Sequence, residues 1–184
     1  MFEDYLTDAT CFLNDAREAA KSGERGVARR NYRAAIIVGA AAMETFVNYI
    51  ANTLELAGEA GLKQYELALL LDRRFGQSEG HFGIQDQVVY SRLEDKLRFL
   101  IERFAIDLDF GVSPAWAHFM QFKGLRDSLV HSKKDEDDTG LEDYDLSCSR
   151  GIRASVELME VLSKGIFKKP LRANLIDLIP ADPT

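Results

Sequence analysis

Apolar side chains recur every three or four residues along most of this chain, which is the spacing of one helix face. No segment of the sequence shows the sustained alternation of a half-buried strand, and no internal repeat is present. The pattern therefore predicts an all-α fold, a helical bundle of about five or six helices. The helices are expected over residues 5–21, 28–57, 62–75, 93–105, 114–132 and 144–166.

The second predicted helix is the longest and the most apolar. Its stretch Ala34–Met43 carries apolar or small residues nearly all round, so we expect this helix at the centre of the bundle. The small residues of this stretch would let neighbouring helix backbones approach closely. Gly58 and Gly61 are expected to end the helix.

Glycine, proline and charged residues mark the connections between the helices. The segment Gly76–Gln87 contains three glycines and is expected to form a mobile loop. Ser113 is a favourable N-cap, and Pro114 occupies the first helical position, which suits proline. Residues 133–140 are expected to form a charged loop. The apolar tail Leu171–Ile179 is expected to dock, either on this chain or on another.

Length and composition are those of a globular protein. The chain has 184 residues, of which 46% are hydrophobic and 29% charged. We expect one domain over residues 1–170, followed by a C-terminal tail over residues 171–184. No run of about 18 uncharged apolar residues predicts a membrane span. The acidic start Met1–Tyr5 lacks the order of a signal peptide, so we expect a cytoplasmic protein.

Charge and metal-binding residues exclude several classes of site. The net charge of −7 argues against a protein that coats nucleic acid by bulk electrostatics, although it allows a small basic site. Cys11 and Cys148 belong to no Cys-x-x-Cys pair and are expected as buried, reduced thiols. His81, His118 and His131 lack the spacing of metal ligands. We therefore expect neither a bound metal nor a cofactor.

A short segment late in the fifth predicted helix is the strongest candidate for chemistry. It brings Arg126 and His131 close to Lys123, Lys133 and Lys134. Arginine offers a planar fork that suits phosphate oxygens, and histidine transfers protons near neutral pH. Metal-free cleavage of an RNA phosphodiester needs such a pair, because one group moves a proton while a cation stabilises the charge that grows on phosphorus. The three lysines are expected to contact the RNA.

Helix geometry leaves the role of this pair open. Residues five apart on a regular helix are rotated by about 140° from each other. Arg126 and His131 would share a face only if the helix is distorted or the long arginine side chain wraps round it. A symmetric dimer relaxes this demand, since two copies of the pair could line one groove. Alternatively, the pair is a chance occurrence, and His131 only caps the end of the helix.

The same residues resemble the motif of the HEPN superfamily, Arg-x4–6-His on a late helix of an all-α bundle. Arg126 and His131 match the two defining positions, and Asp127 stands where asparagine is most common in the family. The alanine-rich helix that leads into Met43–Tyr49 is similar to the central helix of many HEPN proteins, in which an acidic residue follows small and aliphatic ones. In outline the resemblance covers about Ala28–Leu162.

The resemblance implies a homodimer whose two Arg/His pairs face each other across a cleft. Active HEPN proteins are metal-independent endoribonucleases, often toxins or phage-defence effectors, in which the ribose 2′-hydroxyl attacks and a cyclic phosphate remains. By analogy, His131 would be the general acid or base, Arg126 would hold the phosphate, and Asp127 or Ser128 would orient them. The implied partners are RNA or a nucleotide, a second copy of the chain, and an antitoxin or other regulatory protein.

Two questions stay open at the level of sequence. Glu44 lies within the most apolar helix and needs a partner. It is either salt-bridged near Arg126 or anchors another helix through a different arginine. The function has an alternative too, a catalytically inactive helical module that binds a nucleotide or a protein partner. The acidic balance and Asp127 favour that module, whereas the cluster of Arg126, His131 and the lysines favours the ribonuclease.

Overall fold

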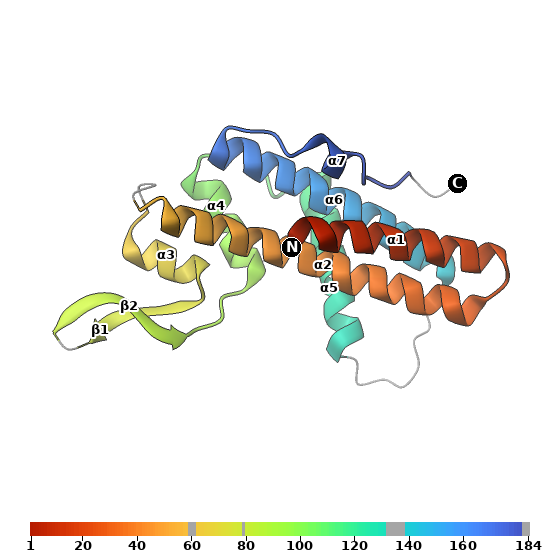
Figure 1. Ribbon diagram of the computed structural model, residues 1–184, viewed down its shortest axis with the longest axis horizontal. Helices are drawn as coiled ribbons and strands as arrows, with labels where there is room; N and C mark the ends of the chain where they lie inside the picture. The colour runs from red at the N-terminus through yellow and green to blue at the C-terminus, as the bar shows by residue number, and fades with distance from the viewer. Residues whose placement is uncertain (59–61, 79, 132–138, 182–184) are drawn as a thin grey trace. The chain divides into compact units, whose positions relative to one another are not determined.

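The computed structural model describes residues 1–58, 62–78, 80–131 and 139–181. Helices dominate these residues, which confirms the all-α class, while the HEPN-like arrangement stays a prediction. In chain order the elements are α1 (Phe2–Lys21), α2 (Arg25–Leu56), α3 (Gln64–Leu70), β1 (Arg73–Ser78), β2 (His81–Val88), α4 (Leu93–Arg103), α5 (Pro114–His131), α6 (Leu141–Phe167) and α7 (Ala173–Ile176) (Figure 1).

The contacts within the chain divide it into two compact units. The first contains residues 1–43 and 106–184, and the second contains residues 44–105. Helix α2 therefore contributes its first part to one unit and its last part to the other. The expectation of one domain over residues 1–170 with a separate tail stays a prediction.

The core of the first unit follows from the apolar spacing of its helices. Helix α1 buries residues three and four apart, namely Leu6, Ala9, Leu13 and Ala16. The rings of Tyr32 on α2 and Tyr144 on α6 stack with their centroids 6.1 Å apart and 7° between their planes. Burial, and then the Asp145 carboxylate, raise the pKa of Tyr32 to about 12. Tyr32 and Tyr144 belong to one hydrophobic core cluster, which also contains Ala28, Ala35, Ile36, Ala40, Phe122, Cys148 and Ile152.

Two glycines bring α5 close to its neighbours in the first unit. A Cβ atom on Gly39 of α2 would lie 3.0 Å from the ring of Phe122, and one on Gly151 of α6 would overlap that ring. The Phe122 ring therefore occupies space that a larger residue at either position would need. This observation agrees with the expectation that small residues of α2 admit close neighbours, and it adds a second such contact on α6.

The C-terminal tail docks on its own chain. Leu175 of α7 is buried, and the Thr10 hydroxyl donates to the Leu178 carbonyl at 3.4 Å. The Glu160 carboxylate accepts hydrogen bonds from the Leu171 amide at 2.6 Å and from Lys164 at 2.6 Å. Burial by itself would raise the pKa of Glu160, but these two hydrogen bonds and the positive charge of Lys164 together lower it. Of the two docking alternatives, the structure therefore supports contact within the chain.

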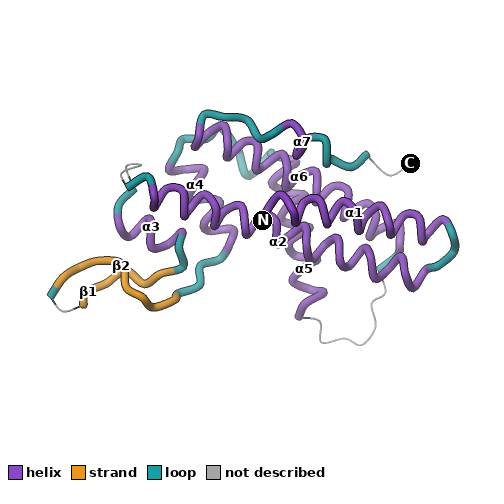
Figure 2. The backbone as a smooth tube through the Cα atoms, viewed as in Figure 1, coloured by secondary structure: helices purple, strands orange, loops and turns teal. Residues whose placement is uncertain are grey.

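The second unit corrects the predicted loop over Gly76–Gln87. The segment forms a hairpin of two antiparallel strands, β1 and β2 (Figure 2). Phe75 pairs with Ile84 and Gly76 with Gly83. The prediction failed because paired glycines give the same sequence signal as a loop. In addition, none of the β2 side chains, all of which are described, is fully buried, so the strand leaves no apolar alternation in the sequence.

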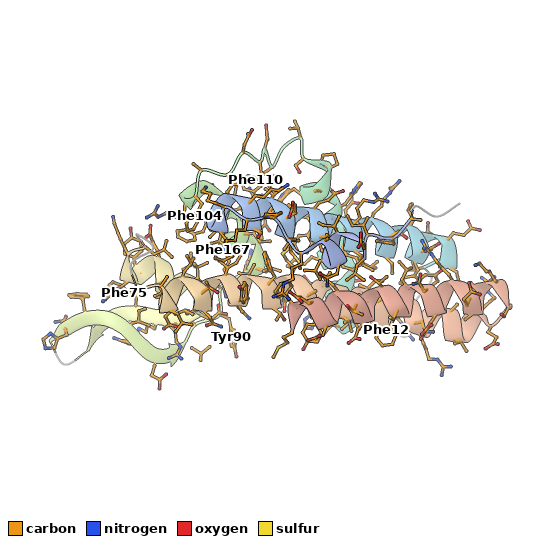
Figure 3. All side chains as sticks on the ribbon, turned by 45° about the horizontal axis from the view of Figure 1, so that its top comes forward. Phe12, Phe75, Tyr90, Phe104, Phe110 and Phe167 are labelled. Atoms are coloured by element: carbon orange, nitrogen blue, oxygen red, sulfur yellow. The ribbon has the colours of Figure 1, made fainter. Side chains whose placement is uncertain are left out.

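Helix α3 is also shorter than predicted, because the chain turns into the hairpin. It ends at Leu70, whereas the expected helix ran to Phe75. Asp72 adopts a left-handed backbone with φ of 55°, which ends helical geometry before β1 begins. The ring of Tyr65 on α3 lies 6.2 Å from that of Phe75, which Figure 3 labels on the hairpin. An aromatic contact therefore joins α3 to β1.

Helix α2 is long and apolar enough to cross a membrane by length and composition. Its most apolar window has a mean hydropathy of 1.6, and 56% of that window is buried inside the protein. The core helix of a folded protein has the same properties. The cytoplasmic location therefore stays a prediction.

Candidate functional site

Helix α5 carries the candidate motif and is anchored at its start as predicted. The Ser113 hydroxyl accepts a hydrogen bond from the Trp116 amide at 3.3 Å, and Pro114 is the first helical residue. The rings of Phe110 and Trp116 meet edge to face with their centroids 4.7 Å apart. Farther along the helix, Phe119 and Phe122 are buried. These contacts hold the part of the helix that precedes the motif.

Arg126 shares an acidic partner with Lys123. The Asp127 carboxylate lies 2.7 Å from the Lys123 ammonium and 3.2 Å from the Arg126 guanidinium. All three side chains are partly exposed, at 23% for Lys123, 20% for Arg126 and 37% for Asp127. One carboxylate therefore offsets part of the charge of two cations at the place where a phosphate is expected.

His131 is the last residue of α5, and its side chain is exposed. The helix continues without a break from Arg126 to His131, so the two residues differ by about 140° in direction and by roughly 7.5 Å along the axis. The Ser128 hydroxyl donates to the Leu125 carbonyl at 2.7 Å. Within one chain, Arg126 and His131 therefore lie on different faces of the helix, as expected for a regular helix.

The remaining predicted site residues are Lys133, Lys134 and Glu44. Lys133 and Lys134 lie outside the described residues. Glu44 belongs to the second unit and is half-buried, and it lines a pocket of about 330 Å³ together with Asp72 and Lys96. The salt bridge between Glu44 and Arg126 therefore stays a prediction.

An ion pair made by the buried Lys96 of the second unit is a feature that sequence reasoning missed. Lys96 of α4 is only 4% exposed, and its ammonium lies 2.7 Å from the Asp72 carboxylate. The Asp72 carboxylate also accepts a hydrogen bond from the Ser91 amide at 2.8 Å. The sequence gives no signal for this pair, because the two residues lie far apart along the chain and each resembles an ordinary surface charge.

A second missed feature is a pocket of about 300 Å³ between α5 and α6 in the first unit. His118 and Gln121 contribute from α5, and Ser147 and Arg150 contribute from α6. His118 drew attention in the sequence only as a possible metal ligand. Its neighbour across the pocket, Arg150, could be found only by pairing the faces of two helices.

Metal chemistry receives no support from the arrangement of potential ligands. Within the part of the chain that the structure describes, no group of three or more His, Cys, Asp or Glu side chains is placed to hold a metal ion. Cys11 is exposed, whereas Cys148 is buried. The expectation of two buried thiols is therefore correct for Cys148 and wrong for Cys11, which lies on the solvent side of α1.

Comparison with known proteins adds no relative to this picture. No family model, no curated protein and no solved structure matches the chain. The HEPN resemblance therefore depends on the motif and on the alanine-rich helix described above.

Proposed function

We propose that this chain is a HEPN-like protein that acts on RNA, as a metal-independent endoribonuclease of a toxin or phage-defence kind. The observation that carries the proposal is the exposed imidazole of His131, five residues beyond Arg126 at the end of α5. An exposed histidine can reach a substrate, which a buried structural histidine cannot.

In the proposed reaction His131 and Arg126 have separate roles. The ribose 2′-oxygen attacks phosphorus as its proton passes to a base, and the bond from phosphorus to the 5′-oxygen breaks as that oxygen gains a proton. His131 supplies the base or the acid. Arg126 stabilises the negative charge on the phosphate oxygens. Asp127 holds the side chains of Arg126 and Lys123 in place.

A homodimer completes the proposal. Because Arg126 and His131 differ by about 140° around one helix, a site with both groups on the same phosphate is easier to build from two chains than from one. Each chain would then supply its arginine to a groove that also contains its partner's histidine.

The inactive module remains the second candidate, because of one contact. Asp127 is ion-paired with both Arg126 and Lys123, which reduces the positive charge offered to RNA. A helical module that binds a nucleotide or a protein partner would tolerate this pairing better than a nuclease would.

The decisive experiment is cleavage of a mixed-sequence RNA in excess EDTA by the parent protein and by the variants His131→Ala and Arg126→Ala. His81→Ala and Arg30→Ala are matched controls, since both side chains are exposed and neither residue belongs to the motif. Circular dichroism would establish that all five proteins are folded. We expect cyclic-phosphate ends from the parent and both controls, and none from the two motif variants. Equal activity in all proteins, or no activity in the parent, would leave the inactive module as the better reading.

Mixing the two inactive variants tests the dimer. Arg126→Ala and His131→Ala chains that exchange subunits would form one complete site in each mixed dimer, and part of the activity would return. If the mixture stays inactive although subunits exchange, the two residues act within one chain.

A further inference from the structure

The pocket between α5 and α6 has four polar side chains and an apolar floor. His118, Gln121, Phe122 and Leu125 follow one face of α5, at positions i, i+3, i+4 and i+7. Leu146, Ser147 and Arg150 face them from α6. The pocket measures about 300 Å³, which is at the small end of the range for ligand sites.

None of the seven residues that line the pocket is acidic. Across the described part of the chain, the side chains of His118, Gln121, Ser147 and Arg150 have no hydrogen-bond or ion-pair partner. The nearest acidic residue earlier on α6, Asp145, binds Arg17 at 2.8 Å. Arg150 therefore keeps an uncompensated charge, unlike Arg126, whose guanidinium lies beside Asp127.

The floor of the pocket is fixed by close packing. Phe122 lies against Gly151, the residue after Arg150, so closely that a Cβ atom there would overlap its ring. On its other side the ring touches Gly39 of α2. Because Phe122 is held by two helices, the backbone positions of His118 on α5 and Arg150 on α6 are defined before any ligand arrives. Such preorganisation lowers the cost of binding.

These groups match the chemistry of a phosphate. A guanidinium binds two phosphate oxygens at once, and imidazole, amide and hydroxyl groups donate the remaining hydrogen bonds. On a chain of net charge −7, an anion is held only where the local balance is positive, as it is here. Leu125 and Leu146 offer apolar surface to a group attached to the phosphate.

We infer that the α5–α6 pocket is a binding site for a phosphate ester, held by Arg150 and His118 and oriented by Gln121 and Ser147. The ester is either a small phosphorylated metabolite or a phosphate of an RNA chain. The inference does not depend on catalysis by Arg126 and His131, since it uses different side chains.

Calorimetric titration of the full chain tests the site, with adenosine 5′-monophosphate as the phosphate ester and adenosine as the probe without phosphate. We expect the monophosphate to bind and adenosine to bind at least tenfold more weakly. Arg150→Ala should weaken binding of the monophosphate roughly tenfold or more, and His118→Gln should weaken that binding less. Arg30→Ala, which removes an exposed arginine of α2 in the same unit, should bind like the parent. Equal binding of both probes, or an Arg150→Ala variant that binds like the parent, would overturn the inference.

Two further arms identify the source of the phosphate and separate this site from the proposed nuclease. If the RNA chain is the natural ligand, a short single-stranded RNA will displace the monophosphate from the parent. If the RNA leaves it bound, the site is for small esters. The binding that Arg150→Ala weakens should persist in the Arg126→Ala and His131→Ala variants. Loss of binding in those variants would place the phosphate at the motif and contradict the assignment to the α5–α6 pocket.

Discussion

The middle and the C-terminal end of α5 differ in whether the cations beside them have acidic partners. In the middle, Phe122 fits between Gly39 and Gly151, and the cation across the pocket, Arg150, has no acidic partner in the lining. At the end, the ion pairs of Asp127 occupy Arg126 and Lys123. The difference teaches that a cluster of cations in a sequence is not a measure of the charge that an anion will meet.

The two regions also differ in what positions their side chains. The middle of the helix is defined by ring-to-glycine contacts with α2 and α6, which are insensitive to salt. The end is defined by partly exposed ion pairs, which are worth little individually and weaken as salt rises. A ligand site in the middle would therefore be preorganised by packing, whereas a site at the end would be held by ion pairs that salt weakens.

The largest expected effect comes from adding one methyl group in each region. Gly151→Ala should destabilise the protein by about 1–3 kcal/mol, because the new Cβ overlaps the ring of Phe122. Gly124→Ala, near the end of α5, should stabilise it by roughly 0.5–1 kcal/mol, because a Cβ there meets nothing within 4 Å and alanine favours the helix. Denaturant unfolding of both variants measures the two changes in the free energy of unfolding, which should have opposite signs.

A double variant shows whether the Phe122 ring is the cause. Phe122→Leu combined with Gly151→Ala should cost less than the sum of the two single changes, because the smaller side chain makes room for the methyl group. Additive costs would mean that the contact with the Phe122 ring is not what limits the size of the side chain at position 151.

The next effect concerns the charge at the end of α5. Asp127→Asn removes the shared partner of Arg126 and Lys123 and should strengthen binding of single-stranded RNA. The plot of log affinity against log salt should steepen by about 0.7 for each cation that gains a phosphate contact. Fluorescence anisotropy at several salt concentrations measures both quantities.

Asp8→Asn is the matched control for that change, since it removes one negative charge from an exposed position on α1. If Asp8→Asn strengthens RNA binding as much as Asp127→Asn does, the effect reports net charge and not the end of α5.

Sequence reasoning succeeded where one helix face decides the structure. The apolar spacing predicted a helix over residues 5–21, which is α1, and the pair Ser113 and Pro114 predicted where α5 begins. The first missed element is the β1–β2 hairpin, whose paired glycines Gly76 and Gly83 cannot be told from loop glycines without their partners.

For the candidate site, sequence reasoning placed residues on a helix but could not give their contacts. Arg126 and His131 stand out because they lie five apart on one helix, and the sequence places both correctly on α5. It could not show that Asp127 pairs with both neighbouring cations, because that depends on side-chain conformations. Nor could it join His118 to Arg150, because the register between α5 and α6 is set by the contact of Phe122 with Gly151.

The smallest effect is a difference in thiol reactivity, and it tests how tightly the middle region is packed. Cys148 follows Ser147 on α6, and burial, with a smaller contribution from the Asp145 carboxylate, raises the pKa of its thiol. The thiolate is the reactive form, so a thiol reagent at pH 8 should label the exposed Cys11 and leave Cys148 unmodified until denaturant is added. Gly151→Ala should increase the labelling rate of Cys148, because a strained α5–α6 contact opens more often, whereas Gly124→Ala should leave that rate unchanged. If Cys148 reacts as fast as Cys11 in the parent protein, the middle of α5 is not held more tightly than its end, and the preorganisation assigned to the phosphate pocket is lost with it.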